Sequence, residues 1–151
     1  MNITITLMND QHVNSVALIE KNNFSEPWSM EAFRNTIDNK DYIYIVALHE
    51  EKVVGYAGCM VAVDEGDITN IAVTKDYRNA GIGAQLLLQL ELQAEKRSVQ
   101  RMFLEVRKSN ESAIGLYRKS GYETVGIRKN FYRKPDEDAY VMCKKIETSG
   151  S

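Results

Sequence analysis

The chain has 151 residues, 44% of them hydrophobic and 26% charged, which is typical of a globular protein with one substantial core rather than a disordered one. Its formal net charge of −2 argues against a general nucleic-acid-binding protein, which would usually be basic. The chain lacks both an apolar run of roughly 18 residues that could span a membrane and the basic, then apolar, start of a signal peptide. We therefore expect a cytoplasmic protein without a direct nucleic-acid or membrane partner.

The first part of the chain predicts one strand and two helices. Residues 3–7 alternate with the period of a strand. The helix predicted next has Asp10 as its N-cap and carries four residues on one face: Val13, Val16, Ala17 and Glu20. Pro27 breaks this pattern within "FSEPWS", and a short helix is expected to begin at Ser29, a second N-cap residue.

The middle of the chain predicts three antiparallel strands. β-Branched and aromatic residues are abundant at 42–48, 53–63 and 68–73. The polar segments "HEEK" and "DEGD" separate these runs as turns. Consecutive strands joined by such short turns form a meander.

A helix and a fourth strand of this region follow. A broad apolar stripe predicts the helix over residues 83–97, and its members are Leu86, Leu87, Leu90 and Ala94. Because this helix separates the strand predicted at 101–106 from the one at 68–73, we expect those two strands to pair in parallel.

The last part of the chain predicts one helix and two closing strands. The helix covers about 110–119, and Gly121 stands where a C′ glycine would end it. The strands are expected at 122–129 and 139–146. Together the elements predict a single α/β (α+β) domain over residues 1–147, with mixed strand directions. Residues 148–151 are expected to be a flexible tail or a cloning remnant.

The cysteines and histidines argue against a metal site. Cys59 and Cys143 lie in apolar strand-like runs, and His12 and His49 lie in polar sequence, so the spacing of the four disfavours a zinc site. An apolar strand raises the pKa of a thiol and lowers its reactivity. We expect two buried structural cysteines, no cysteine nucleophile and no metal.

The segment "RNAGIGA" at residues 78–84 is the most informative motif. It lacks the Lys and Ser/Thr that a P-loop has after its last glycine, and Leu86 replaces the third glycine of a dinucleotide fingerprint. One alternative is a tight turn without a ligand. The other is an anion-binding loop, in which glycines let backbone N–H groups approach a pyrophosphate at the start of a helix and Arg78 adds a positive charge.

This segment resembles the Q/R-x-x-G-x-G/A signature of the GNAT acetyltransferases, and the resemblance covers nearly the whole chain. The segments "FSEPWS", "NIAV", "LEVRKSNESAIGLY" and "KNFYRKPDEDAYVM", in this order, are similar to one family within it, the bacterial ribosomal-protein-alanine N-acetyltransferases (RimI). The resemblance implies the GNAT fold: a mixed, mostly antiparallel central sheet flanked by helices, with a splayed parallel pair of central strands. It also implies acetyl-CoA as cosubstrate and the N-terminal segment of a protein, a small-subunit ribosomal protein, as acceptor.

The resemblance assigns the cofactor to two segments and one helix start. The pyrophosphate is expected at the glycine loop, and the pantetheine amides along the backbone of the preceding strand. Asn110 is expected to contact coenzyme A, although it could simply cap its helix. The expected cofactor-binding residues are Ile71, Ala72, Val73, Arg78, Asn79, Ala80, Gly81, Ile82, Gly83, Ala84 and Asn110.

Two residues are candidates for the chemistry. Glu105 lies in an apolar strand, on the face it shares with Phe103 and Arg107, where it could be a general base or a structural partner of Arg107. Tyr117 lies on the inward face of its helix, where it could be a general acid or a core aromatic residue. The resemblance implies direct attack by the acceptor amine, with Glu105 as base and Tyr117 as acid that protonates the thiolate.

The acceptor side is expected from the same resemblance. It would be formed by "FSEPWS" and the late segment "NFYRKPDEDAY", with Phe24, Pro27, Trp28 and Tyr132 as candidate contacts. Three acidic residues in one predicted turn could favour a cationic N-terminus or could simply be solvated: Asp64, Glu65 and Asp67.

Three functions remain open from the sequence. The first is acetylation of an N-terminal alanine. The second is acetylation of another amine, such as a protein lysine, a polyamine or an aminoglycoside. The third is a non-catalytic acyl-CoA-binding module, which the presence of both Glu105 and Tyr117 disfavours.

Overall fold

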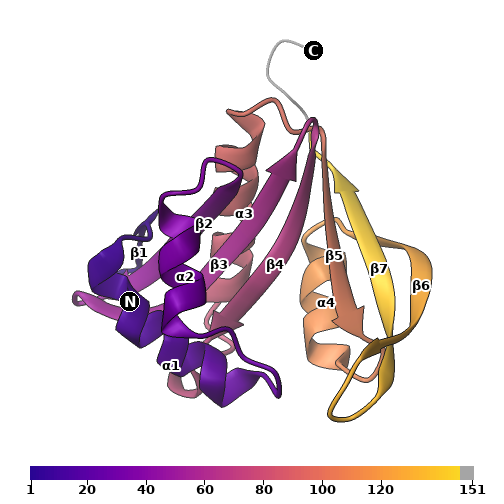
Figure 1. The fold of residues 1–151 in the computed structure, drawn as a ribbon, viewed down its shortest axis with the longest axis horizontal. Coiled ribbons are helices and arrows are strands. Elements are labelled where there is room, and N and C mark those ends of the chain that lie inside the picture. Colours follow the sequence, from indigo (N-terminus) through magenta and orange to yellow (C-terminus); the bar gives the residue numbers. More distant parts are fainter. Residues whose placement is uncertain (147–151) are drawn as a thin grey trace.

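The structure is a computed structural model that describes residues 1–146; the predicted tail over 148–151 lies outside the described residues. Its centre is one seven-stranded sheet with the order β1-β2-β3-β4-β5-β7-β6 (Figure 1). All neighbouring strands are antiparallel except β4 and β5, which are parallel. The strands are β1 (Thr4–Leu7), β2 (Tyr42–His49), β3 (Lys52–Ala62), β4 (Glu65–Val73), β5 (Arg101–Arg107), β6 (Glu123–Tyr132) and β7 (Glu137–Lys145).

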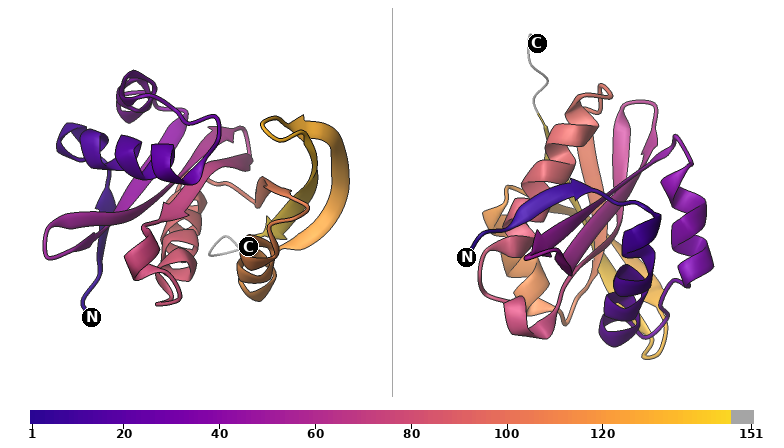
Figure 2. Two further views of the ribbon diagram at one scale, coloured as in Figure 1. Left: turned by 90° about the horizontal axis from the view of Figure 1, so that it is seen from below. Right: turned by 90° about the vertical axis from the view of Figure 1, so that its left-hand side faces the viewer.

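Helices cover both faces of the sheet (Figure 2). Two of them, α1 (Val13–Asn23) and α2 (Met30–Ile37), contribute Val16, Ile19 and Phe33 to an apolar cluster on one face. The other two, α3 (Ile82–Glu95) and α4 (Glu111–Lys119), pack into a larger cluster on the opposite face. The short 3₁₀ helices η1 (Asp10–His12) and η2 (Lys75–Tyr77) precede α1 and α3.

The predicted order of elements is confirmed, including the antiparallel meander β2-β3-β4 and the parallel pairing of β4 with β5. Ser29 caps α2 as predicted, because its Oγ accepts a hydrogen bond from the backbone N–H of Ala32 (3.1 Å). Gly121 has φ +100°, the left-handed conformation expected of a residue that ends a helix.

Three local predictions were wrong. Asn9, not Asp10, is the first N-cap: its side chain accepts from Gln11 N, and Asp10 begins η1. The turn between β3 and β4 lies at residues 63–64, so only the first residue of "DEGD" belongs to it; β4 already begins at Glu65 and pairs there with β3 and β5. Of the two cysteines, Cys59 is buried but Cys143 is only half-buried.

The parallel contact between β4 and β5 is short. It consists of three residue pairs, Glu65–Arg101, Gly66–Met102 and Asp67–Phe103. Beyond these pairs the strands diverge, while β4 stays bonded to β3 and β5 to β7 (Figure 1). The sheet therefore consists of two halves that meet at one end and separate at the other.

A bulge in β4 lies where this separation begins. The β3–β4 register pairs Gly58 with Asn70 and Cys59 with Ile68, so Thr69 is the extra residue. Gly58 also lies directly under the ring of Tyr44: a Cβ added there would come within 2.2 Å of a ring carbon. Tyr44 in turn donates a hydrogen bond from its hydroxyl to Asn70 Oδ1 (2.6 Å). The absence of a side chain at Gly58 thus makes room for a ring that is hydrogen-bonded to the bulged strand.

We predict that Gly58→Ala lowers the free energy of unfolding by about 1–3 kcal/mol, because a buried aromatic ring must move to make room for a methyl group. Urea unfolding of the purified protein measures this change. Gly115→Ala is the matched control, since a Cβ at Gly115 meets nothing within 4 Å and alanine favours the interior of α4. A Gly58→Ala variant as stable as the wild type would contradict the predicted overlap with Tyr44.

Candidate active site

The start of α3 provides an open backbone cradle. Gly81 is the N-cap with φ +79°, and no side chain caps the helix there. A Cβ built on Gly81 has nothing within 4 Å, so the space beside this backbone is free. The first N–H groups of a helix have no intrahelical partner and carry partial positive charge. These features fit a bound anion such as a pyrophosphate.

Gly83 has a different reason to be glycine. A Cβ at this position would lie 3.0 Å from Cδ2 of Leu116 on α4. The glycine therefore allows α3 and α4 to approach each other closely. Of the two glycines in the motif, only Gly81 borders open space.

The guanidinium of Arg78 makes hydrogen bonds within the chain, so it is not wholly free to contact a ligand. Its Nε donates to the carbonyl of Val73 at the end of β4 (3.1 Å), and its Nη2 donates to Asn23 Oδ1 at the end of α1. The positive charge remains beside the glycine loop, but two of its N–H groups are used within the chain. Arg78 consequently links the glycine loop to α1, the helix that precedes "FSEPWS".

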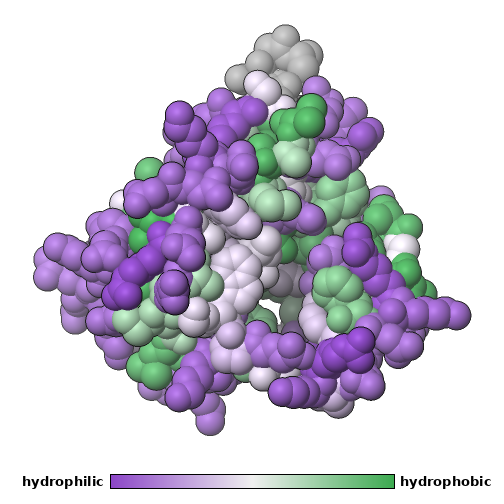
Figure 3. Space-filling view, in the orientation of Figure 1, coloured by the Kyte–Doolittle hydropathy of each residue, from purple (hydrophilic) through white to green (hydrophobic). Residues whose placement is uncertain are grey.

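The diverging end of β4 has one bonded edge and one open edge. Ile71, Ala72 and Val73 pair with β3, whereas pairing with β5 ended at Asp67. Apart from the Val73 carbonyl, which accepts from Arg78, backbone groups of 71–73 on the β5 side can therefore bond an extended ligand such as pantetheine. Figure 3 shows the surface hollowed below its centre, where these strands separate in Figure 1.

Asn110 caps α4, since its Oδ1 accepts from the backbone N–H of Ala113 (3.2 Å). This bond is the structural role that its position predicted. A contact with coenzyme A remains a prediction.

Glu105 is half-buried in β5, two residues beyond the last parallel pair. Burial raises the pKa of its carboxyl, the neighbouring negative charge of Asp67 raises it further, and the positive charge of Arg128 lowers it. Arg107, the cation that the sequence suggested as a partner of Glu105, forms its ion pair with Glu137 instead (3.3 Å). The cation that acts on Glu105 comes instead from β6.

Tyr117 is buried in α4, and its ring packs edge-on against Tyr122 at 6.1 Å between centroids. Burial raises the pKa of its hydroxyl, and Tyr132 adds to this shift. Tyr117 is therefore protonated near neutral pH, as a proton donor must be.

Tyr132 is linked electrostatically to both Glu105 and Tyr117. Burial raises the pKa of its hydroxyl to about 12; the charge of Glu105 also raises it, and Arg107 lowers it. The guanidinium of Arg107 stacks on its ring, 4.4 Å from the centroid. The end of β6 therefore lies close enough to Glu105 and Tyr117 for their pKa values and that of Tyr132 to be linked.

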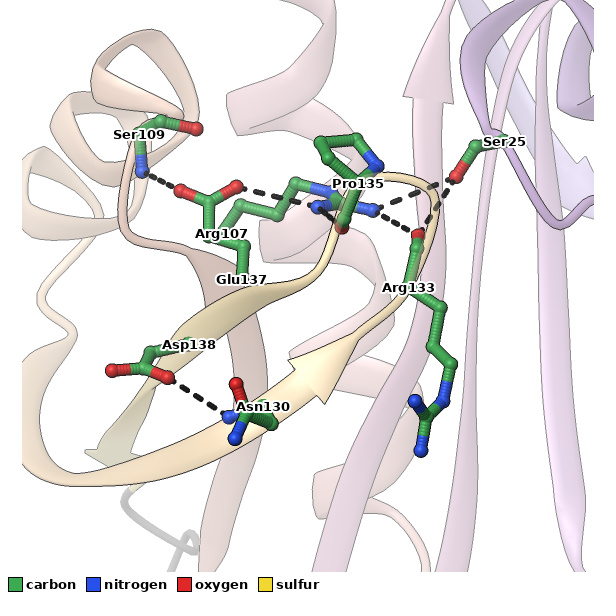
Figure 4. Close-up of polar contacts among 8 residues, drawn as sticks. All are labelled: Ser25, Arg107, Ser109, Asn130, Arg133, Pro135, Glu137 and Asp138. Carbon is green, nitrogen blue, oxygen red and sulfur yellow. Dashed lines mark hydrogen bonds and ion pairs between the residues drawn. The ribbon is translucent and has the colours of Figure 1, made fainter.

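Arg107 organises the segment between β6 and β7 (Figure 4). Its guanidinium donates to the carbonyls of Arg133 and Pro135, both at 2.8 Å. It also reaches Ser25 Oγ at 3.5 Å, and Ser25 donates to the Arg133 carbonyl at 3.4 Å. Glu137 completes the cluster by accepting from Arg107 and from the backbone N–H of Ser109 (2.7 Å). Two segments far apart in sequence are thus joined beside Glu105's strand.

The predicted acceptor residues differ in exposure. Phe24 is 40% exposed and Pro27 is exposed, so both are available to a ligand. Trp28 instead packs on Phe33 and Tyr44, with ring centroids 5.4 and 6.1 Å away, and so anchors its own loop. Asp64, Glu65 and Asp67 do not share a turn, because the last two belong to β4.

Sequence reasoning missed the interactions of three charged residues. Asp67 and Arg128 act on the pKa of Glu105, and the buried Glu20 accepts hydrogen bonds from Trp28, Tyr56 and Asn70. The sequence indicated that Glu20 would make buried hydrogen bonds, because a glutamate on an otherwise apolar helical face needs hydrogen-bond partners. The sequence indicated nothing of this kind for Arg128, because its proximity to Glu105 arises only from the pairing of β5, β7 and β6.

Other kinds of site find little support in residues 1–146. No group of three or more His, Cys, Asp or Glu residues in this range could hold a metal ion. Burial raises the pKa of both thiols, to about 12 for Cys59, which argues against a cysteine nucleophile. Every helix in the described part of the chain is too short or too polar to cross a membrane.

Comparisons with known proteins give a consistent result. A model of the acetyltransferase (GNAT) family matches residues 13–122. The [ribosomal protein bS18]-alanine N-acetyltransferase of Haemophilus influenzae is 38% identical over 128 residues, which are 83% of this chain and 86% of that protein. The enzyme of the same name from Escherichia coli (strain K12) is 34% identical over 145 residues, 95% of this chain and 97% of that protein. The crystal structure of the ribosomal-protein-S18-alanine N-acetyltransferase from Escherichia coli has a TM-score of 0.89 at 33% identity and covers 99% of this chain and 97% of that one.

We predict that two substitutions move the pKa of Glu105 in opposite directions. Asp67→Asn removes a negative charge and lowers this pKa, whereas Arg128→Gln removes a positive charge and raises it. NMR titration of the Glu105 carboxyl carbon measures both shifts. Asp38→Asn, an exposed change at the end of α2, is the control and leaves the titration unchanged. Shifts of the same sign in the first two variants would refute the described electrostatics.

Proposed function

Because the chain belongs to the GNAT acetyltransferase family and is an acetyl-CoA-dependent N-acetyltransferase, we propose that its acceptor is the α-amine of an N-terminal alanine, that of ribosomal protein bS18. The observation that carries this proposal is 34–38% sequence identity, over most of the chain, to enzymes with this named activity. Acetyl-CoA supplies an acetyl group activated as a thioester. The proposed cofactor residues are those of the glycine loop, the open edge of β4 at 71–73, and Asn110.

The chemistry of an α-amine suits a single carboxylate base. An α-amine has a pKa of about 8 and a lysine about 10.4, so much less free energy is needed to neutralise the former near neutral pH. In the proposed mechanism Glu105 takes a proton from the acceptor ammonium, directly or through water. The raised pKa of its carboxyl makes it a stronger base than an exposed glutamate.

Tyr117 is proposed to complete the proton balance. The amine nitrogen bonds to the acetyl carbon, the carbon–sulfur bond breaks, and Tyr117 donates its proton to the departing thiolate. The nitrogen then loses its second proton to water, and a proton from water restores the Tyr117 hydroxyl. Phenol and thiol pKa values of about 10 and 8.5 allow this transfer, although the buried hydroxyl of Tyr117 is a weaker acid than free phenol. Phe24, Pro27, Trp28 and Tyr132 are proposed to form the acceptor side.

Glu105→Gln is expected to retain coenzyme A binding and to lower turnover roughly 10²–10⁴-fold near neutral pH, the usual contribution of a positioned base. Part of the activity returns at higher pH, where the amine loses its proton unaided. Calorimetric titration with coenzyme A and initial rates of acetylation measure the two effects. Tyr117→Phe is expected to slow transfer with binding largely intact. Wild-type turnover in a folded Glu105→Gln variant would leave Glu105 a structural residue.

The acceptor itself is tested with one peptide in four forms: alanine first, a bulky residue first, the N-terminus blocked, and the N-terminus blocked with an internal lysine. We expect the alanine form to be fastest, because a larger side chain must overpack a pocket that fits a methyl group, at a cost of about 1–3 kcal/mol, or roughly 5- to 150-fold in rate. The blocked forms should be inert. Equal acetylation of the lysine form would favour a lysine or another amine as the acceptor.

A further inference from the structure

A buried carboxylate lies beneath the segment 24–29, which we call the acceptor loop. Glu20, one turn before the end of α1, is only 2% exposed. Its Oε2 accepts from the backbone N–H of Trp28 (2.9 Å). Its Oε1 accepts from Asn70 Nδ2 (3.1 Å) and from the Tyr56 hydroxyl. Glu20 is thus the common partner of the acceptor loop, β3 and β4.

The contacts of Glu20 continue to the bulge of β4. Asn70 directly follows Thr69, the extra residue of the bulge, and its Oδ1 accepts from the Tyr44 hydroxyl (2.6 Å). Tyr44 also bonds Thr69 through the two hydroxyl oxygens (2.7 Å). A single chain of hydrogen bonds therefore runs from the acceptor loop to the point where β4 begins to leave β5.

The geometry makes Glu20 a specific anchor rather than a general packing residue. The three groups that donate to it are neutral, and a buried carboxylate is stable only while its hydrogen bonds are made. The acceptor loop has no regular secondary structure, so the Trp28 N–H bond and the packing of the Trp28 ring set its height above the sheet. The far side of the same loop reaches Arg133 and Arg107 through Ser25.

We propose that Glu20 is a positioning residue of the acceptor site. It holds the acceptor loop and the bulged part of β4 in one arrangement, and selectivity for the first residue of the acceptor depends on that arrangement. This inference rests on the proposed function, because it takes segment 24–29 to be the part of the chain that meets the acceptor.

Glu20→Gln tests the inference with little change in shape. The glutamine amide presents a donor where the carboxylate accepted from Asn70 and Tyr56 or from Trp28, so at least one bond of the network is lost. We expect KM for the alanine peptide to rise roughly tenfold and its rate advantage over the bulky peptide to fall several-fold. Coenzyme A affinity stays within about twofold. Amide exchange of Trp28, followed by NMR, becomes faster.

Glu91→Gln is the matched control. Glu91 is 6% exposed, accepts from the Tyr122 hydroxyl (3.0 Å) and from Lys144 (2.7 Å), and lies in α3 on the opposite face of the sheet. Like Glu20→Gln, this variant loses a buried hydrogen bond and therefore stability. We expect it to leave the acceptor KM and the selectivity unchanged. If Glu20→Gln also changes only stability, Glu20 is purely structural and the inference is wrong.

Two further measurements keep the outcome decisive. Tyr56→Phe removes one donor to Glu20 and preserves the ring, so it replaces Glu20→Gln if that variant does not fold; an unchanged acceptor KM would then overturn the inference. The wild type is assayed first on the four peptides. If the wild type does not prefer the alanine peptide, the proposed function is wrong. If the variant and the wild type have the same KM and selectivity on the acceptor that the wild type uses, only the role of Glu20 is wrong.

Discussion

The separation of β4 from β5 is the constraint on which the rest of the molecule depends. Each strand keeps its antiparallel partner on the other side, β3 for β4 and β7 for β5, so the two halves of the sheet stay intact while the edge between them opens. The opening exposes backbone at 71–73 and brings the half-buried Glu105 to its border. An uninterrupted parallel pairing would have used these groups within the sheet and left no path from the α3 side to the α1 side.

Much of the fold was predictable because it is encoded in short-range patterns. The alternation of 42–48 and 53–63, the apolar stripe of α3 and the cap at Ser29 each depend on a few neighbouring residues. The errors occurred where long-range contacts decide. "DEGD" has turn composition, but Gly66 pairs with Val61 on one side and Met102 on the other, and this pairing draws the segment into β4.

The site was predictable to the level of candidate groups but not of their partners. The glycine loop and the glutamate in an apolar strand are visible in the sequence. Which cation acts on Glu105 is not, because Arg107 and Arg128 are both available and only the pairing of β6 with β7 selects the second. The same limit applies to Gly83, whose neighbour Leu116 lies in another helix.

The proposed cofactor residues and the proposed acceptor residues come from different parts of the chain, and this separation affects how such a protein can diversify. The groups proposed for the cofactor come from one central stretch, 71–84, and from Asn110, whereas the segments proposed for the acceptor lie near the two ends, at 24–29 and 130–140. The end segments meet through Ser25 and Arg107, with little involvement of the glycine loop beyond the bond from Arg78 to Asn23. Changes of length or sequence in either end segment can therefore create new acceptor preferences in descendants of one ancestral gene. The residues proposed to bind acetyl-CoA can be inherited unchanged meanwhile.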